Sequence, residues 1–292
     1  MPLLVKAGHK VVALARSEER ATQLAQMGAL PVVGDVYDAA RLEQLVTKSE
    51  AEVVLHQLTA FGTRDGDPYA ETIRVRIEGT RNLVAAARAA KARRFIAQSI
   101  SFMCSPRGSG LTDEETPLYL DSPTGVRALA EAIASLESQT LGASGIAGTV
   151  LRYGWFYGPG TSYDPQGTIP TAIRKGAMPV VGDGAGTYSF INLNDAAAAT
   201  LKVLAQESRG IYNIVDDSPV RFSEWLPVAA KLLHAPAPGH LDEAAARQKI
   251  GDMRVYYMTR QRGASNAKAK RDFNWQPATP SWRTGFEALY SR

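Results

Sequence analysis

Short apolar segments alternate with helix-like segments along the first half of the chain, and this alternation restricts the fold more than any other feature of the sequence. The strand-like segments cover residues 9–15, 30–33, 52–58, 94–99 and 147–152. Most are separated by segments with helical apolar spacing, at residues 18–27, after Asp38, at 69–89 and at 126–141. Strands that alternate with helices form a parallel sheet covered on both faces. The sequence therefore predicts an α/β fold.

Local signals mark where these helices begin and which face they bury. Ser17 is a favourable N-cap, and Glu18 and Glu19 follow in the first turn, beside the positive end of the helix dipole. Asp38 can cap the next helix in the same way. The spacing within 69–89 predicts one continuous helix with a single apolar face formed by Ile73, Ile77, Thr80 and Val84.

Composition and charge exclude several classes of protein. The chain has 292 residues, 45% of them hydrophobic and 21% charged, which is typical of a globular protein. Its net charge of +4 comes from scattered basic residues, so nucleic-acid binding is not favoured. No apolar run reaches the roughly 18 residues of a membrane helix, and the single cysteine fits a reducing compartment. We expect a cytoplasmic protein with a small-molecule partner.

One stretch, at residues 149–160, reads TVLRYGWFYGPG and combines a strand, aromatic side chains and a Gly-Pro-Gly turn. Ligands of open α/β sheets bind outside the carboxyl ends of the strands, so this stretch is a plausible pocket wall. Its aromatic side chains could equally be core packing beside a turn.

The same stretch resembles the segment that opens the substrate lobe in extended short-chain dehydrogenase/reductases, the NAD-dependent epimerase/dehydratase family. Seven further segments resemble the family in the same order, so that the resemblance covers nearly the whole chain. They are GDVYD (34–38), HQLTA (56–60), EGTRNLVAAA (78–87), RRFIAQSIS (93–101), SFINLNDAAAA (189–199), YNIVDD (212–217) and NWQP (274–277).

The resemblance implies a Rossmann-like doubly wound parallel sheet over residues 1–152 and a smaller, mostly helical substrate lobe over 153–292. It implies an NAD(P)-dependent oxidoreductase, epimerase or dehydratase that acts on a small carbonyl or polar compound, and a possible homodimer. No metal site is expected, because the four histidines are isolated in the sequence.

The resemblance also assigns cofactor-binding residues at successive strand ends. Arg16 and Ser17 follow the strand whose end would carry an acid in an NAD enzyme, and an arginine there favours NADP. The other positions match residues that flank the adenine, cover the nicotinamide-side ribose or end the fourth strand; they are Asp35, Val36, Leu58, Thr59, Ala60 and Ser99. Each also has a structural explanation: Arg16 as an exposed helix-start residue, Asp35 as a turn residue, and 58–60 as an ordinary connection.

The catalytic pattern of the family is missing. Family enzymes carry a Tyr-x-x-x-Lys pair on the helix after the fourth strand, and here that helix reads TGVRALAEAIASLES. Its acids, Glu131 and Glu137, are expected to face solvent. Ser101 and Tyr157 are the substitute catalytic candidates, with packing as the alternative for Tyr157. A non-redox descendant of the fold that binds a small ligand, senses it or reuses the pocket for other chemistry is therefore a second hypothesis.

The first strand of the family and its glycine-rich turn are not found either. Residues 1–7 resemble only the end of the helix that follows that turn. A longer natural protein and a truncated relative with weakened or lost cofactor binding both explain this. Without that strand we expect two open strand edges and an exposed apolar surface.

Overall fold

The computed structural model describes residues 1–60 and 69–291. It divides into two compact units. Unit 1 comprises Met1–Ser99, Glu131–Leu151 and Thr200–Ile211, and unit 2 comprises Ile100–Ala130, Arg152–Ala199 and Tyr212–Arg292. This division differs from the predicted boundary at residue 152, because each unit is assembled from separated parts of the chain.

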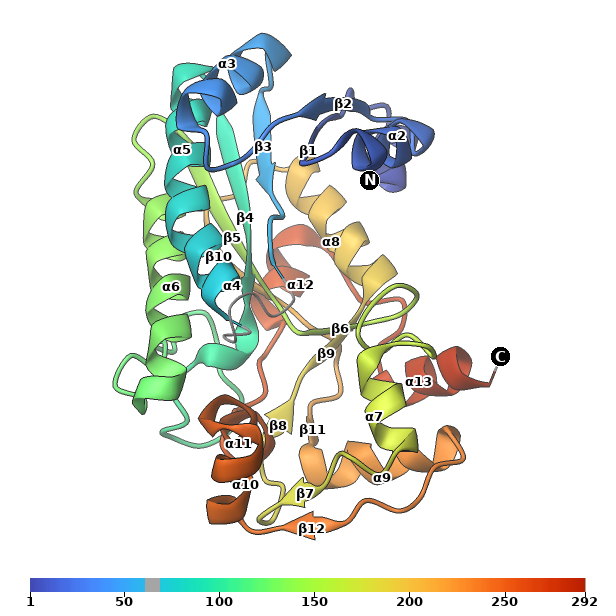
Figure 1. Cartoon of the computed structure of the whole chain (residues 1–292). Coiled ribbons are helices and arrows are strands. Elements are labelled where there is room, and N and C mark those ends of the chain that lie inside the picture. Colours follow the sequence, from blue (N-terminus) through green and yellow to red (C-terminus); the bar gives the residue numbers. More distant parts are fainter. Residues whose placement is uncertain (61–68, 292) are drawn as a thin grey trace. The chain divides into compact units, whose positions relative to one another are not determined.

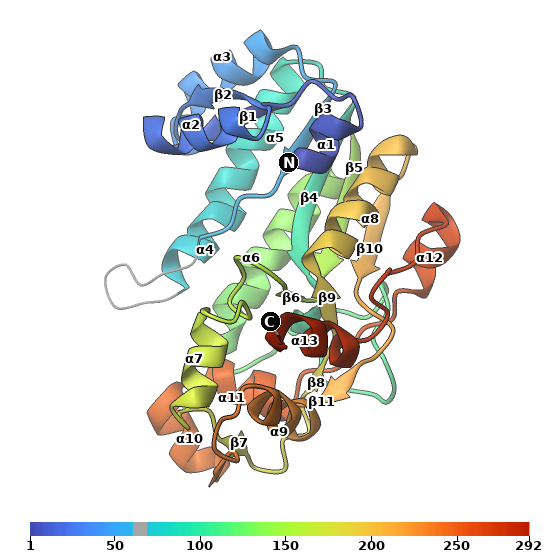
Figure 2. The ribbon, with the colours of Figure 1, turned by 90° about the vertical axis from the view of Figure 1, so that its right-hand side faces the viewer.

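A four-stranded sheet with the order β10-β5-β4-β3 forms the centre of unit 1. Its strands are β3 (Val53–His56), β4 (Arg94–Ile100), β5 (Ala147–Tyr153) and β10 (Gly210–Ile214), and β3 pairs with β4 in parallel. Helices α5 (Thr80–Ala89) and α6 (Thr124–Leu141) lie on one side of this sheet, and α8 (Leu193–Ala205) lies on the other (Figures 1 and 2). The predicted α/β fold with covered strands is confirmed.

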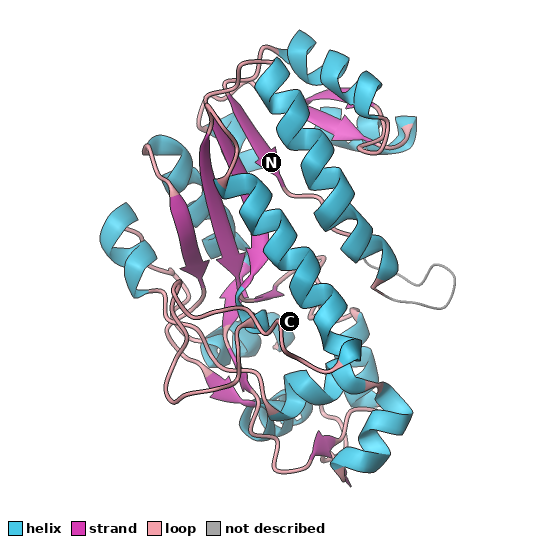
Figure 3. Ribbon diagram, turned by 90° about the vertical axis from the view of Figure 1, so that its left-hand side faces the viewer, coloured by secondary structure: helices cyan, strands magenta, loops and turns pink. Residues whose placement is uncertain are grey.

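A second, two-stranded sheet completes unit 1. Strand β1 (Val12–Ala15) pairs in parallel with β2 (Leu30–Val33), and α1 (Pro2–Lys6) and α2 (Glu18–Gln26) flank them in sequence. Figure 3 shows these two strands as a group of their own. Among the described residues β1 pairs only with β2, and β3 pairs only with β4. The two open strand edges expected from the sequence are therefore present.

The predicted helix starts are correct, and one predicted helix face is partly wrong. Ser17 Oγ accepts a hydrogen bond from the Arg20 amide at 3.2 Å, and Asp38 Oδ1 accepts one from the Arg41 amide at 3.0 Å; these side chains cap α2 and α3 (Ala39–Ser49). The segment 69–89 forms α4 (Ala70–Arg74), a π-helical turn at Val75–Gly79 and then α5. The extra residue of a π turn rotates the helix face, so that Ile77 is 41% exposed instead of buried.

The core of unit 1 packs α3, α5 and α6 against the sheet. Its fully buried members include Leu42, Ala87, Phe95 and Leu136. Helices α3 and α5 are held against each other by this cluster, so the carboxyl ends of β2 and β3 are anchored to a packed layer.

Unit 2 contains three short strand pairs and several helices. The pairs are β6 (Trp155–Tyr157) with β9 (Phe190–Asn192), β8 (Thr187–Tyr188) with β11 (Val220–Arg221), and β7 (Val180–Val181) with β12 (His240–Leu241). The helices wholly within it are α7 (Thr168–Arg174), α9 (Phe222–Leu232), α10 (Glu243–Ile250), α11 (Asp252–Thr259), α12 (Ala267–Phe273) and α13 (Trp282–Tyr290). In the part of the chain that is described, no helix is both long and apolar enough to cross a bilayer.

Candidate functional site

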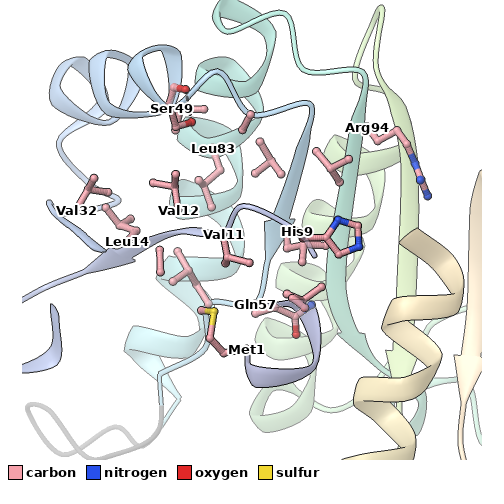
Figure 4. Close-up of a pocket in the computed structure, with 18 of the residues that line it drawn as sticks. Met1, His9, Val11, Val12, Leu14, Val32, Ser49, Gln57, Leu83 and Arg94 are labelled. Carbon is pink, nitrogen blue, oxygen red and sulfur yellow. Dashed lines mark hydrogen bonds between the residues drawn. The ribbon is translucent and has the colours of Figure 1, made fainter. Parts of the chain in front are cut away.

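A cavity of about 2080 Å³ lies entirely within unit 1 and brings most of the predicted cofactor residues together. Six of the eight line it: Arg16, Ser17, Val36, Leu58, Thr59 and Ala60. They come from the ends of β1, β2 and β3, as the strand-end rule for α/β sheets predicts. Figure 4 shows this cavity with apolar side chains of β1 and α5, among them Val12, Leu14 and Leu83, directed toward it.

The end of β1 offers a site for an anion. Arg16 and Arg20 both line the cavity at the start of α2, whose positive end is capped by Ser17. The Arg20 guanidinium donates to Gln23 Oε1 at 2.7 Å, whereas Arg16 has no hydrogen bond or ion pair within the described residues. Two guanidinium groups beside a helix N-terminus attract a phosphate.

The two residues predicted to flank the adenine have different surroundings. Val36 is buried on the cavity wall, and its carbonyl accepts a hydrogen bond from Asn82 Nδ2 at 2.9 Å, which fixes it to α5. Asp35 is exposed, is not part of the cavity wall, and accepts the Tyr37 amide at 2.9 Å. Asp35 thus forms the turn that was its alternative explanation.

A buried histidine holds the loop that follows β3. His56 is only 1% exposed; its Nε2 lies 2.8 Å from Thr80 Oγ1, and its Nδ1 accepts the Leu58 amide at 3.3 Å. Burial, with a contribution from the nearby Arg76 charge, lowers the pKa of His56 to about 3, so the ring is neutral. Because Nδ1 accepts, the proton is on Nε2, which donates to Thr80.

The other end of this loop is fixed as well. Thr72 Oγ1 of α4 donates to the carbonyl of Ala60. Between the two anchors, Thr59 Oγ1 is buried and has no hydrogen-bond partner in the described part of the chain. A buried hydroxyl without a partner is costly, and other atoms of Thr59 line the cavity. His56 is not among the residues predicted from the sequence, although its position within the HQLTA segment was the available signal.

The remaining predicted residues lie away from the cavity. Ser99 is fully buried and donates to Glu137 Oε1 at 2.8 Å, so its hydroxyl is turned toward α6. The expectation that Glu137 faces solvent is wrong: it is 5% exposed, because it accepts this bond inside the unit. Glu131 is exposed, as expected.

The two catalytic candidates belong to unit 2. Ser101 begins the short 3-10 turn Ser101–Met103 and is 2% exposed. Tyr157 is fully buried, with its ring edge-to-face against Phe190 and Phe286 at centroid distances of 6.3 and 5.3 Å. Burial raises the pKa of Tyr157 above its ordinary value. This environment is core packing, which argues against Tyr157 as a proton donor. The described residues contain no cluster of side chains suited to a metal ion.

These features define an α/β protein with a cavity at its strand ends, and comparison with known proteins specifies the family. Residues 1–215 match the NAD dependent epimerase/dehydratase family, so the chain belongs to that family. It is 41% identical over 282 residues to a 3-diazoavenalumate denitrifying reductase of a Streptomyces species, covering 95% of this chain and 91% of that protein. A 4-hydroxy-2-methyl-3-oxo-4-farnesyl-3,4-dihydroquinoline-1-oxide ketoreductase of Stigmatella aurantiaca is 26% identical, covering 93% and 86%.

Solved structures share the fold. A UDP-glucose 4-epimerase of Thermotoga maritima with UDP-glucose superposes with a TM-score of 0.76 at 18% identity, covering 99% of this chain and 92% of that chain. MoeE5 in complex with UDP-glucuronic acid and NAD gives a TM-score of 0.73 at 21% identity with the same coverages. The predicted family and the Rossmann-like fold are thereby confirmed, and NAD is bound by structural neighbours.

Proposed function

We propose that this protein is an NADPH-dependent reductase that acts on a small, electron-poor substrate, with diazo-bearing carboxylates as the substrate class. The observation that carries the proposal is a combination: six of the eight predicted cofactor residues line one cavity, whereas helix α6 contains neither tyrosine nor lysine. This combination supports cofactor binding without the proton-transfer pair of the family.

The residues at the cavity fit the nucleotide. Arg16 and Arg20 at the start of α2 suit the 2′-phosphate of NADP, which supports NADP over NAD. Thr59 lines the cavity at the position that the family resemblance assigns to the nicotinamide-side ribose, and His56 and Thr72 hold its loop in place. Val36 supplies an apolar surface for the adenine.

The absence of the Tyr-x-x-x-Lys pair favours a hydride acceptor whose reduction needs no proton. Reduction of a carbonyl places negative charge on oxygen, and a general acid that neutralises it contributes about 10²–10⁴ in rate. A diazonium group already carries positive charge, so that addition of a hydride neutralises the substrate. When bound, the nicotinamide supplies this hydride.

The balance of the reaction is R–N₂⁺ + NADPH → R–H + N₂ + NADP⁺. The new C–H bond uses the electron pair of the hydride, and the pair of the broken C–N bond leaves with N₂. No proton is taken up or released. The 41% identical relative is named for a diazo-bearing substrate and for denitrifying reduction, which supports this substrate class.

An isotope experiment tests the proposal. The protein is incubated with NADPH deuterated at the transferable position and with 4-carboxybenzenediazonium as the probe; we expect N₂ release and one deuterium on the ring carbon of the product. In D₂O with ordinary NADPH, no deuterium should enter that position. A rate that is independent of pH over the range where tyrosine and lysine titrate is expected as well. Incorporation from solvent would contradict direct hydride transfer.

The alternative functions give different results. A carbonyl reductase with a substitute donor such as Ser101 would reduce carbonyl probes with a pH-dependent rate. A non-redox descendant would bind without oxidising NADPH, and absence of any thermal shift with NADPH and NADH would contradict the cofactor assignment itself. The homodimer and the cytoplasmic location stay predictions from the family resemblance.

A further inference from the structure

Tyr37 is held in a fixed position at the wall of the cavity in unit 1. Its amide donates to Asp35 Oδ1 at 2.9 Å, and its hydroxyl donates to Glu71 Oε1 at 2.8 Å. The guanidinium of Arg74 lies over one face of the ring, 3.7 Å from the centroid. Burial and the hydrogen bond to Glu71 raise the pKa of Tyr37 above its ordinary value, so that the hydroxyl stays protonated and keeps donating. The side chain is therefore fixed at both of its ends and on one ring face.

Glu71 presents a carboxylate at the same wall. It lies in the first turn of α4 and lines the cavity together with Val36 and Tyr37. Its Oε1 accepts the Tyr37 hydroxyl, whereas no described residue donates to Oε2, and this oxygen is not enclosed. Arg74 forms its ion pair with Glu78, at 3.0 Å, rather than with Glu71. We call Val36, Tyr37 and Glu71 the acidic corner of the cavity.

Asp35, the acid that the family resemblance assigns to the adenine, does not share this corner. It is exposed, it is not part of the cavity wall, and its Oδ1 accepts the Tyr37 amide. Val36 is buried and gives the wall an apolar surface. The acidic corner thus combines an apolar surface, a fixed aromatic ring and one carboxylate oxygen that has no donor among the described residues.

These three groups suit a flat heterocycle that carries an amino group on its edge. A carboxylate only accepts hydrogen bonds, so an N–H group that faces Oε2 of Glu71 would be paired. A ring carbonyl at the same place would put two acceptors against each other and leave both without a donor, which costs free energy where water is excluded. Adenine carries an amino group at position 6, whereas hypoxanthine and guanine carry a carbonyl there. The acidic corner therefore favours adenine over both.

We infer that Glu71 selects adenine nucleotides by accepting a hydrogen bond from the 6-amino group, and that Tyr37 is the positioning residue that holds its carboxylate. The inference rests on the proposed function, which puts the adenine of NADPH against Val36. Neither Tyr37 nor Glu71 is among the residues that the family resemblance assigns. Recognition of the amino group thereby moves from Asp35, in the turn after β2, to a side chain of α4.

Two nucleotides that differ at one position of the purine test the inference without reference to the reaction. NADPH carries the 6-amino group, and its deamino analogue carries a carbonyl there; the Kd of each is measured from the fluorescence of the reduced nicotinamide. We expect the parent protein to bind NADPH at least about tenfold more tightly than the analogue, because a hydrogen bond to a charged group is lost. In Glu71→Gln the side-chain amide can donate to the carbonyl as well as accept from the amino group, so that the two Kd values should agree within about twofold.

Two further variants make the test specific. Glu78→Gln is the matched control: it removes the same charge from the π-helical turn that follows α4, but Glu78 is not part of the cavity wall, so the preference for NADPH should remain. Tyr37→Phe keeps the ring and loses only the bond to Glu71. It should lower the preference without abolishing it, and it provides a second measurement if Glu71→Gln does not fold in urea titrations.

Three results would overturn the inference. Equal Kd values of the two nucleotides in the parent protein would show that no group distinguishes position 6 of the purine. An unchanged preference in both Glu71→Gln and Tyr37→Phe would assign the selection to another residue. Absence of binding of either nucleotide would overturn the cofactor assignment as well, whereas failure of the diazonium reduction would leave all of these Kd values unchanged.

Discussion

Replacing His56 by asparagine or by glutamine removes its two hydrogen bonds one at a time. The two variants test whether His56 positions the loop that follows β3 for cofactor binding. In His56→Asn, the amide oxygen lies where Nδ1 was and can still accept the Leu58 amide, but the bond to Thr80 is lost. In His56→Gln, the amide nitrogen can still donate to Thr80, but the acceptor for Leu58 is lost. Thr80→Val removes the same bond as the asparagine variant from the other side.

The size of the effect follows from these contacts. One hydrogen bond contributes about 1 kcal/mol, which corresponds to about a fivefold change in affinity. We therefore expect the Kd for NADPH, measured by fluorescence titration, to rise about fivefold in His56→Gln and to change little in His56→Asn and Thr80→Val. All three variants should lose stability, because each loses a buried contact. Equal Kd values in the glutamine and asparagine variants would refute the positioning role.

The pH dependence of stability gives a second measurement on the same variants. The pKa of His56 is lowered from 6.5 in the unfolded chain to about 3 in the folded protein, because burial disfavours the charged ring. Between these values the unfolded chain binds a proton that the folded protein does not, so stability falls as pH decreases from 6.5 to about 3. The slope reaches up to about 1.4 kcal/mol per pH unit. Both His56 variants should lack this slope in urea titrations.

Two further predictions concern single charged residues. Arg16→Gln should raise the Kd for NADPH about tenfold or more, because a charge-assisted hydrogen bond contributes about 1.5–3 kcal/mol. The Kd for NADH should stay nearly unchanged. Equal effects on both nucleotides would contradict NADP selectivity. Asp216 is buried, and burial raises the pKa of its carboxyl group from 3.8 to about 8. Between these pH values the folded protein holds a proton that the unfolded chain has released. The free energy of unfolding therefore falls as pH rises from about 4 to 8. Asp216→Asn should abolish this fall in thermal melts and be more stable than the parent at pH 8.5, and an unchanged pH profile would contradict a protonated Asp216.

Much of the fold could be predicted because its determinants are local. Helix starts at Ser17 and Asp38 depend on side chains three residues from the amides they cap, and strand positions depend on short apolar runs. The division into units could not be predicted from such signals. Strand β10 belongs to the sheet of unit 1 because it pairs with β5, about 60 residues earlier in the chain. The π turn at Val75–Gly79 likewise has no local signature, and it moved Ile77 out of the buried face.

In the candidate site, the directions of single side chains could not be predicted from the sequence either. The strand-end rule predicted that Arg16, Val36 and Thr59 lie near one another, and all three line the cavity, because parallel strands bring their carboxyl ends to one edge of the sheet. Ser99 lies one residue before the end of β4, but its hydroxyl bonds to Glu137 on α6. A position at a strand end is set by the backbone, whereas the direction of a side chain depends on its partners across the fold.

Buried polar residues are the hardest to predict from the sequence. Glu137 looked like a surface acid and His56 like an isolated histidine, since each is defined by a partner 38 or 24 residues away. Each of these hydrogen bonds joins a strand to a helix that packs on the sheet: Glu137 on α6 bonds to Ser99 on β4, and His56 on β3 bonds to Thr80 on α5. A buried polar group without such a partner would cost more free energy than a typical surface substitution. Their burial with satisfied hydrogen bonds at the ends of β3 and β4 therefore indicates that this edge of the sheet is built to be rigid, as a site that positions a cofactor loop requires.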